Sequence, residues 1–200
     1  MRSDRKIYFG SDRLGGMIAQ NLKTTDPSIT LVEPDLKRDP ALGVKWLQGN
    51  LGFHTLSLMG VPDKDNKPTT LEAETERVRG FIEGKNQLNW MIQYQRKIVG
   101  LVWVDLSPWE GLPAPSVHIM IGDPEMRGKG VGTASMRSVL DYLENQGHAT
   151  IYSRHLTFND TVKKMLFSLG FEDAGIPHSD ADGLEWQDLV WRQKRSSGTN

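Results

Sequence analysis

The 200-residue chain has no cysteine, which excludes disulfide bridges, cysteine–zinc sites and thiolate catalysis. It also has no apolar run of the ~18 residues that a membrane-spanning helix needs. Neither sign of charge dominates, because 24 Lys and Arg oppose 25 Asp and Glu, so the composition favours neither nucleic acid nor a membrane surface as a partner. The polar start, MRSDRKIYFGSDR, lacks a signal-peptide core, so we expect a cytoplasmic protein. We expect no metal site.

The most informative stretch of the chain is VHIMIGDPEMRGKGVGT, residues 117–133. Apolar and polar residues alternate from Val117 to Ile121, which predicts a strand, and Asp123-Pro124 ends it. A glycine-rich loop follows, and then a run with apolar residues at helical spacing. A loop that opens a helix presents free backbone N–H groups at the positive end of the helix dipole. This loop is therefore predicted to hold an anion.

Three kinds of anion-binding loop can be compared with this one. A Walker A loop needs a glycine where Asp123 stands and a serine or threonine where Gly130 stands, so it is excluded. A dinucleotide fingerprint needs a third glycine where Thr133 stands, so it is excluded too. What remains is the pattern Arg-x-x-Gly-x-Gly, from Arg127 to Gly132.

A second pattern, NDTVKKMLFSLGF, runs from Asn159 to Phe171. Asn159 suits a helix N-cap, and Gly170 suits the left-handed residue just past a helix end. Together the two patterns resemble the GNAT superfamily of N-acetyltransferases, in which the first is the pyrophosphate loop for acyl-CoA. The segment IGDPEMRGKGVGT is most similar to the branch of RimJ/RimL protein N-terminal acetyltransferases and spermidine acetyltransferases.

The resemblance implies direct attack of an acceptor on acetyl-CoA, the co-substrate, in a ternary complex. The implied acceptor is a primary amine of a small molecule or of a protein N-terminus, and a homodimer is compatible with the family. In this family the pantetheine arm lies between the fourth and fifth strands, which splay apart. The resemblance assigns these residues to the cofactor: Ile119, Met120, Ile121, Arg127, Gly128, Lys129, Gly130, Val131, Gly132, Thr133, Asn159 and Lys164.

The order of the expected elements predicts an α/β (α+β) fold. The resemblance implies the same GNAT-like layout, a mixed and mostly antiparallel central sheet with helices on both faces. One domain is expected over residues 29–194, with an N-terminal extension packed on it over 1–28 and a disordered tail over 195–200. The extension is expected to hold a strand over 6–9 and a helix over 14–22. Within the domain we expect strands over residues 29–32, 88–94, 98–105, 117–121, 150–156 and 183–191. We expect helices to begin at Asp39, at Thr69 through a capping box with Glu72, after Gly130, and at Asn159.

Four residues are candidates for the proton transfers of acetylation. His118 lies on the fourth strand, and His155 lies at the end of the fifth, where relatives usually carry an apolar side chain. Histidine is a suitable general base near neutral pH, but either residue could instead be a hydrogen-bonded structural histidine. Asp105 and Glu110 flank the loop after the third strand. They could collect a cationic amine or deprotonate it through water, or they could simply be solvated.

The acid that would protonate the leaving thiolate cannot be carried over. Many family members have a tyrosine where this chain has Leu166, and the RimJ/RimL branch has a serine where it has Val162. Thr161, Ser153, Tyr152 and water all stay open. This departure motivates an alternative function, a catalytically silent acyl-CoA-binding or regulatory module on the same fold. A structural domain with an empty loop is a further alternative.

Aromatic residues are expected near the acceptor. Trp103 and Trp109 could form, with Asp105 and Glu110, an aromatic and acidic pocket for an amine. The alternative for Trp103 is a place in the core, whereas Trp109 lies in a proline-rich loop and is the stronger candidate for substrate contact.

Overall fold

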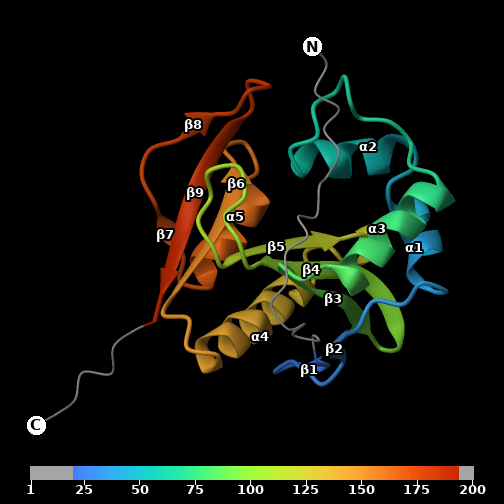
Figure 1. Ribbon diagram of the computed structural model, residues 1–200, viewed down its shortest axis with the longest axis horizontal. Helices are drawn as coiled ribbons and strands as arrows, with labels where there is room; N and C mark the ends of the chain where they lie inside the picture. The colour runs from blue at the N-terminus through green and yellow to red at the C-terminus, as the bar shows by residue number, and fades with distance from the viewer. Residues whose placement is uncertain (1–19, 194–200) are drawn as a thin grey trace, which may run out of the picture.

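The computed structural model describes residues 20–193 (Figure 1). The strands are β1 (Leu22–Lys23), β2 (Ile29–Val32), β3 (Gln87–Tyr94), β4 (Lys97–Asp105), β5 (Ser116–Ile121), β6 (Thr150–Leu156), β7 (Glu172–Asp173), β8 (His178–Ser179) and β9 (Glu185–Arg192). The helices are α1 (Asp39–Trp46), α2 (Gly49–Leu58), α3 (Leu71–Glu83), η1 (Pro124–Met126, 3₁₀), α4 (Val131–Asn145) and α5 (Asp160–Ser168). None of these helices is both long and apolar enough to cross a bilayer.

Most of the predicted extension lies outside the described residues. The strand expected over 6–9, residues 14–19 of the expected helix and the tail over 195–200 are among the residues that are not described. The remaining end of that expected helix is wrong, because Leu22 begins β1, which pairs antiparallel with β2. Residues 22–23 therefore extend the sheet of the domain.

One mixed sheet organises the fold, in the order β1-β2-β3-β4-β5-β6-β9-β7, with β8 also on β9. Every pairing is antiparallel except that of β5 with β6, which run parallel. The β5–β6 ladder has a single register pair, Ser116 with Tyr152, and beyond it the two strands separate (Figure 1). The splay expected between the fourth and fifth strands of the domain is confirmed, since β5 and β6 are those strands.

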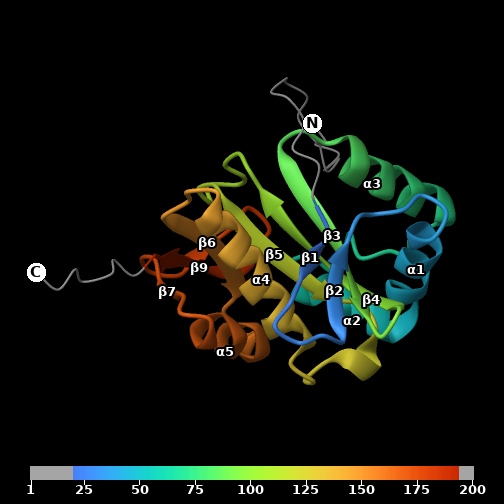
Figure 2. The same ribbon diagram turned by 90° about the horizontal axis from the view of Figure 1, so that it is seen from below.

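Helices cover both faces of the sheet (Figure 2). On one face, Val117 of β5 belongs to a buried cluster with Val139 of α4 and Leu166 of α5. On the other face, Met120 of β5 lies in a second cluster with Trp46 of α1. The predicted alternation along β5 is therefore correct. One face of β5, beside the splay, packs toward α4 and α5, and the other packs toward α1 and α2.

Helix α2 was not predicted, because two glycines interrupt its sequence. Gly49 takes a positive φ of 64°, which favours glycine. A Cβ atom on Gly52 would lie only 2.2 Å from the carbonyl carbon of Leu47, so α2 follows α1 too closely for a larger residue. The tight α1–α2 connection, rather than helix propensity, explains both residues.

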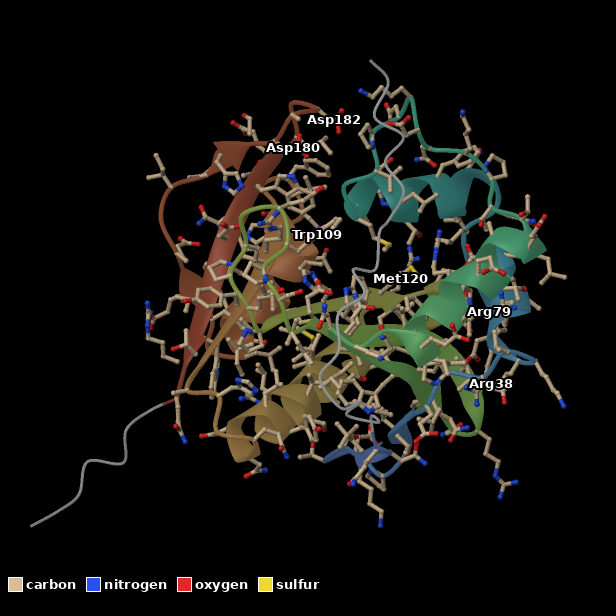
Figure 3. All side chains as sticks on the ribbon, viewed as in Figure 1. Arg38, Arg79, Trp109, Met120, Asp180 and Asp182 are labelled. Atoms are coloured by element: carbon tan, nitrogen blue, oxygen red, sulfur yellow. The ribbon has the colours of Figure 1, made fainter. Side chains whose placement is uncertain are left out.

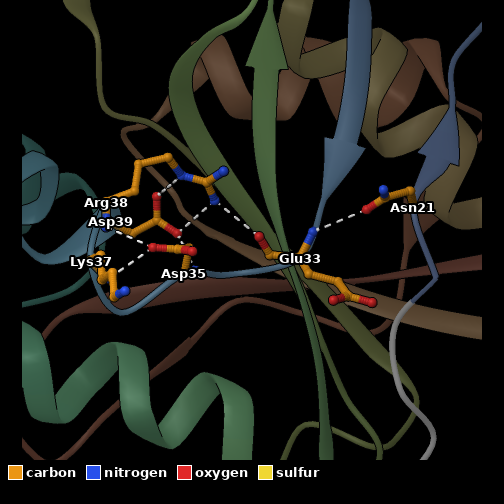
Figure 4. A network of polar contacts seen from close by, with 6 residues as sticks. All are labelled: Asn21, Glu33, Asp35, Lys37, Arg38 and Asp39. Atoms are coloured by element: carbon orange, nitrogen blue, oxygen red, sulfur yellow. Dashed lines mark hydrogen bonds and ion pairs between the residues drawn. The ribbon is translucent and has the colours of Figure 1, made fainter.

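The start of α1 is held by a network around the buried carboxylate of Asp39 (Figure 4). The Arg38 guanidinium donates to both Asp39 oxygens, at 2.5 and 2.9 Å, and to the carbonyl of Glu33 at 2.9 Å. Asp39 also accepts the amide N–H of Asp35 at 2.7 Å. The bidentate ion pair raises the pKa of Arg38, mainly through its hydrogen bond to Asp39.

The start of α3 differs from the predicted capping box by one residue. Thr70, not Thr69, is the N-cap, and its hydroxyl accepts the amide N–H of Ala73 at 3.1 Å. Thr69 instead donates to the buried carboxylate of Glu74 at 2.6 Å. Two adjacent threonines made the position of the cap ambiguous in the sequence.

Candidate active site

The edge of β5 facing the splay carries backbone groups that are free to bind a ligand. The carbonyl of Pro115 accepts the Tyr152 amide N–H, and the carbonyl of Val117 accepts the Ser153 hydroxyl, both at 2.9 Å. Because backbone groups alternate along a strand, the N–H and C=O of Ile119 face the same side. Neither has a partner among residues 20–193. An extended chain with amide groups could pair there as a further strand does.

The loop before α4 is open toward solvent and rich in unpaired amides. Gly128 and Gly130 have positive φ angles of 72° and 78°, and a Cβ atom on either would have no neighbour within 4 Å. Gly130 is the N-cap and supplies no side-chain acceptor, so the N–H groups of Val131, Gly132 and Thr133 have no partner within the described part of the chain. Three such donors at a positive helix end fit a pyrophosphate.

Arg127 lies beside this loop, and the protein itself holds its side chain. Its Nε donates to the carbonyl of Ile121 at 3.0 Å, and an Nη donates to the hydroxyl of Thr55 on α2 at 2.8 Å. The guanidinium therefore joins the end of β5 to α2. Lys129, by contrast, is exposed within the loop.

The second pattern forms α5 as expected. The side-chain oxygen of Asn159 accepts the Val162 amide N–H at 3.3 Å, and Gly170 has a φ of 93° just past the helix end. Asn159 is buried, whereas Lys164 is exposed on α5. Asn159 thus caps the helix at the splay.

The structure brings two of the four proton-transfer candidates together. His118 Nε2 lies 3.1 Å from Asp105 Oδ2 and 3.2 Å from the hydroxyl oxygen of Ser116. The Trp103 and His118 rings stack, with centroids 5.1 Å apart and an interplanar angle of 18°. Gln87 of β3 donates to the other oxygen of Asp105 at 2.5 Å. No signal in the sequence had pointed to Gln87.

This arrangement selects one form of the His118 ring. A carboxylate only accepts hydrogen bonds, so the contact with Asp105 assigns the proton of the neutral ring to Nε2. Nδ1 then carries a lone pair, and it has no partner among the described residues. The His118 side chain is 17% exposed, so a ligand can reach it. His118 is therefore arranged to accept a proton at Nδ1.

His155 is in a different environment. It is only 3% exposed, and its Nδ1 lies 2.7 Å from the carbonyl of Leu156. Its Nε2 is buried without a partner. On β6 it shares a face with Ile151, a member of the cluster with α4 and α5, whereas His118 lies on the opposite face of the sheet. The two histidines are therefore not parts of one site.

The loop over residues 106–115 lies against β6. The carbonyl of Glu110 accepts a hydrogen bond from Arg154 at 3.2 Å, while the Glu110 side chain is exposed and outside the His118 network. Trp109, which is 42% exposed, extends from the same loop (Figure 3). Arg154 also lies 3.3 Å from Asp188 and stacks on Trp186.

The structure reduces the number of side chains that could protonate a leaving thiolate. Leu166 is buried in the core, and the hydroxyl proton of Ser153 is already donated to the carbonyl of Val117. The hydroxyl groups of Thr161 and Tyr152 donate no hydrogen bond within residues 20–193. That same part of the chain has no group of three or more His, Asp or Glu side chains that could hold a metal ion.

Comparison with known families agrees with this geometry. Residues 30–172 match the family described as "Acetyltransferase (GNAT) domain". The chain belongs to the GNAT acetyltransferase family. The match spans both sides of the splay, the glycine loop and all of α5. No curated protein sequence matches the chain.

Solved structures with this fold include three acetyltransferases. RimL, a ribosomal L7/L12 alpha-N-protein acetyltransferase in complex with coenzyme A, has a TM-score of 0.70 at 14% identity over 86% of this chain and 98% of its own. The microcin C7 self-immunity acetyltransferase MccE, in complex with acetyl-CoA and AMP, has a TM-score of 0.68 at 14% identity over 84% and 94%. The aminoglycoside acetyltransferase AAC(6')-Ib, with coenzyme A, has 0.65 at 19% over 83% and 95%.

Proposed function

We propose that this protein transfers an acetyl group from acetyl-CoA to a primary amine, with His118 as the general base. The observation that carries the proposal is the Asp105–His118 contact, which engages Nε2 and leaves Nδ1 without a partner among the described residues, at a partly exposed position beside the splay. Family membership supplies the acetyl donor class, and the unpaired amides of the α4 loop support binding of its pyrophosphate.

In the proposed reaction both substrates are held in one complex. Binding a donor and an acceptor in line can contribute roughly 7–11 kcal/mol to lowering the barrier. The neutral amine attacks the thioester carbonyl, a C–N bond forms, and His118 Nδ1 takes the proton from nitrogen. A backbone N–H of the free β5 edge, such as that of Ile119, is suited to the negative carbonyl oxygen.

The C–S bond then breaks, and coenzyme A leaves as a thiolate. A thiol such as that of cysteine has a pKa of about 8.5, which is acidic enough for the thiolate to leave without a strong acid beside it. Water, Tyr152 or Thr161 can return a proton to sulfur. The Asp105 carboxylate stabilises the His118 imidazolium until the proton taken from the amine passes to solvent.

The side chains beside His118 and on the loop after β4 support an amine as the acceptor. Asp105 and Trp103 contact His118 and present a carboxylate and an aromatic face, and the exposed Trp109 and Glu110 lie on the loop that follows β4. Such groups attract an ammonium group before it loses its proton. A protein N-terminus, a polyamine and an aminoglycoside each carry such a group. RimL and AAC(6')-Ib have this fold and are named for the first and the last of them.

The test is an acetyl-transfer assay that follows thiol release from acetyl-CoA with three acceptors: a short peptide, spermidine and an aminoglycoside. His118→Ala is expected to lower turnover by about 10²-fold or more while acetyl-CoA still binds. Release that does not depend on any amine, or a His118→Ala variant as fast as the parent, would overturn the proposal.

The buried Leu166 supports a second candidate, a silent acyl-CoA-binding module. That function predicts binding of acetyl-CoA, measured by calorimetry, without consumption in the presence of any amine. Acetyl-CoA at 100 times its dissociation constant adds about 2.7 kcal/mol of stability in either case. Turnover with one amine therefore decides between the two functions.

A further inference from the structure

Gln87 is the outer member of a polar row that crosses three strands to the proposed base. Its Cα pairs with that of Asp105 on β4, and Asp105 in turn pairs with Ser116 on β5. The Gln87 Nε2 donates to Asp105 Oδ1 at 2.5 Å, and the other Asp105 oxygen, Oδ2, contacts His118 Nε2. Gln87 itself does not contact His118.

A hydrogen bond to one carboxylate oxygen restricts the other. The last side-chain torsion of aspartate is broad, so the carboxylate plane of Asp105 is not set by its rotamer alone. The amide N–H of Gln87 holds Oδ1 and leaves Oδ2 for the imidazole. Because the amide is neutral, it orients the carboxylate without protonating it or supplying a competing cation.

This arrangement leaves the carbonyl oxygen of the Gln87 amide without a hydrogen bond among the described residues, which costs stability. Gln87 Oε1 is buried and has no hydrogen-bond partner. A buried acceptor without a partner destabilises a fold, and an apolar residue of similar size at this strand position would avoid that cost. The amide is thus better explained by its donor, which is directed at Asp105, than by packing.

We infer that Gln87 is a positioning residue for catalysis: its amide orients Asp105, so that Asp105 holds His118 in the form with Nδ1 free. The inference rests on the proposed function, because it assigns no role to Gln87 unless His118 is the base. It is separate from acetyl-CoA binding, since Gln87 lies on β3 and the splay lies between β5 and β6.

Two variants of the full chain test the inference. Gln87→Met keeps the volume and removes the donor, and Gln87→Glu keeps the shape and replaces the donor with a second carboxylate. Gln93→Met is the matched control, a glutamine on the same strand whose side chain makes no hydrogen bond among the described residues. For each protein we would measure kcat, the KM for acetyl-CoA, the thermal midpoint and the ring ¹⁵N chemical shifts of His118.

We expect both Gln87 variants to lose about 10- to 100-fold in kcat while the KM for acetyl-CoA stays within about twofold. The ¹⁵N shifts are expected to change from a single protonated Nε2 to a mixture of tautomers. Gln93→Met should match the parent in every measurement. A purely structural role would lower the thermal midpoint without moving kcat per folded enzyme or the ring shifts.

The outcomes separate this inference from the proposed function. If Asp105→Asn and His118→Ala lose turnover but either folded Gln87 variant keeps the parent kcat and ring shifts, the inference is overturned and the base assignment stands. If His118→Ala keeps turnover, the proposed function fails first and the inference fails with it. If Gln87→Met does not fold, Gln87→Glu decides alone by the same readings.

Discussion

Asp105 and His118 are in contact although they are not cross-strand partners. The Cα partner of Asp105 is Ser116 and that of His118 is Trp103, so the 3.1 Å contact runs diagonally between β4 and β5. The diagonal leaves the face of the imidazole to Trp103, and its edge points to the carboxylate. Stacking on Trp103 and the hydrogen bond to Asp105 together restrict the ring more than either contact would alone.

Replacing Asp105 with asparagine tests this diagonal contact. The amide keeps the size of the side chain but removes the charge that stabilises an imidazolium, and it can present an N–H where the ring needs an acceptor. We expect kcat to fall about 10²-fold with little change in acetyl-CoA affinity. Asp173→Asn on β7, an exposed aspartate, is the control and should behave like the parent. Equal kcat in both variants would remove Asp105 from the mechanism.

Glycine at position 130 is expected to matter for acetyl-CoA binding as well as for the backbone conformation. Both Gly130 and Gly147 have positive φ, at 78° and 91°, open space around a built Cβ, and places at opposite ends of α4. Alanine should cost each variant about 1–2 kcal/mol of stability. Only Gly130→Ala should also weaken acetyl-CoA binding, by about tenfold or more as measured by calorimetry, because its methyl group occupies the ligand side. An equal affinity in both variants would contradict the loop assignment.

Much of the fold could be predicted because its signals are local. Alternation along β5 and the bounds of β2 and β6 follow from apolar periodicity, which requires no knowledge of neighbours. Helix α2 could not be predicted, since Gly52 is required by its approach to Leu47, a contact that exists only in the folded chain. Sequence patterns and propensities report local periodicity, but they do not report contacts that form only on folding.

Part of the candidate site could be predicted from the sequence, and part of it could not. The glycine loop and Asn159 form contiguous patterns, whereas the site around His118 depends on registers. Asp105 meets His118 because a loop over 106–115 sets how β5 returns beside β4. Gln87 joins them from a third strand, and a glutamine at the start of a strand carries no pattern of its own.

Arg38 is expected to be important for stability. The Asp39 side chain is fully buried, so replacing Arg38 with methionine leaves a buried carboxylate without its cation. We expect a loss of about 2 kcal/mol, less than for a fully buried pair because the Arg38 side chain is 37% exposed. For a chain of this size that lowers the melting temperature by about 4–8 °C.

The matched control is Arg79→Met, at an exposed position of α3 (Figure 3). This variant breaks an ion pair with Glu76 on the same helix. Its expected cost is below about 0.5 kcal/mol. Melting temperatures that fall by the same amount in both variants would show that the Asp39 network contributes nothing beyond a surface pair.

The ion pair between Lys97 and Asp123, at 2.5 Å, predicts a dependence of stability on pH. The Lys97 hydrogen bond lowers the pKa of Asp123. A lowered folded-state pKa stabilises the protein above the unfolded value of about 3.9, and that contribution is lost as the pH falls through the folded value. Because Lys97 is 59% exposed, Lys97→Met should cost only about 0.5 kcal/mol at pH 7. Denaturant unfolding should show this difference shrinking below pH ~4, and a constant difference would contradict it.

The two histidines predicted as bases can be separated by the same substitution. His155→Phe fills a buried site and removes an Nε2 that has no partner, so we expect unchanged or higher thermal stability and a kcat within a few-fold of the parent. His118→Phe keeps an aromatic ring beside Trp103 but removes the nitrogen that would accept the proton, and its kcat should fall by about 10²-fold or more. The reverse result, with turnover lost in His155→Phe and kept in His118→Phe, would assign the base to β6 and place the amine on the α5 face of the sheet.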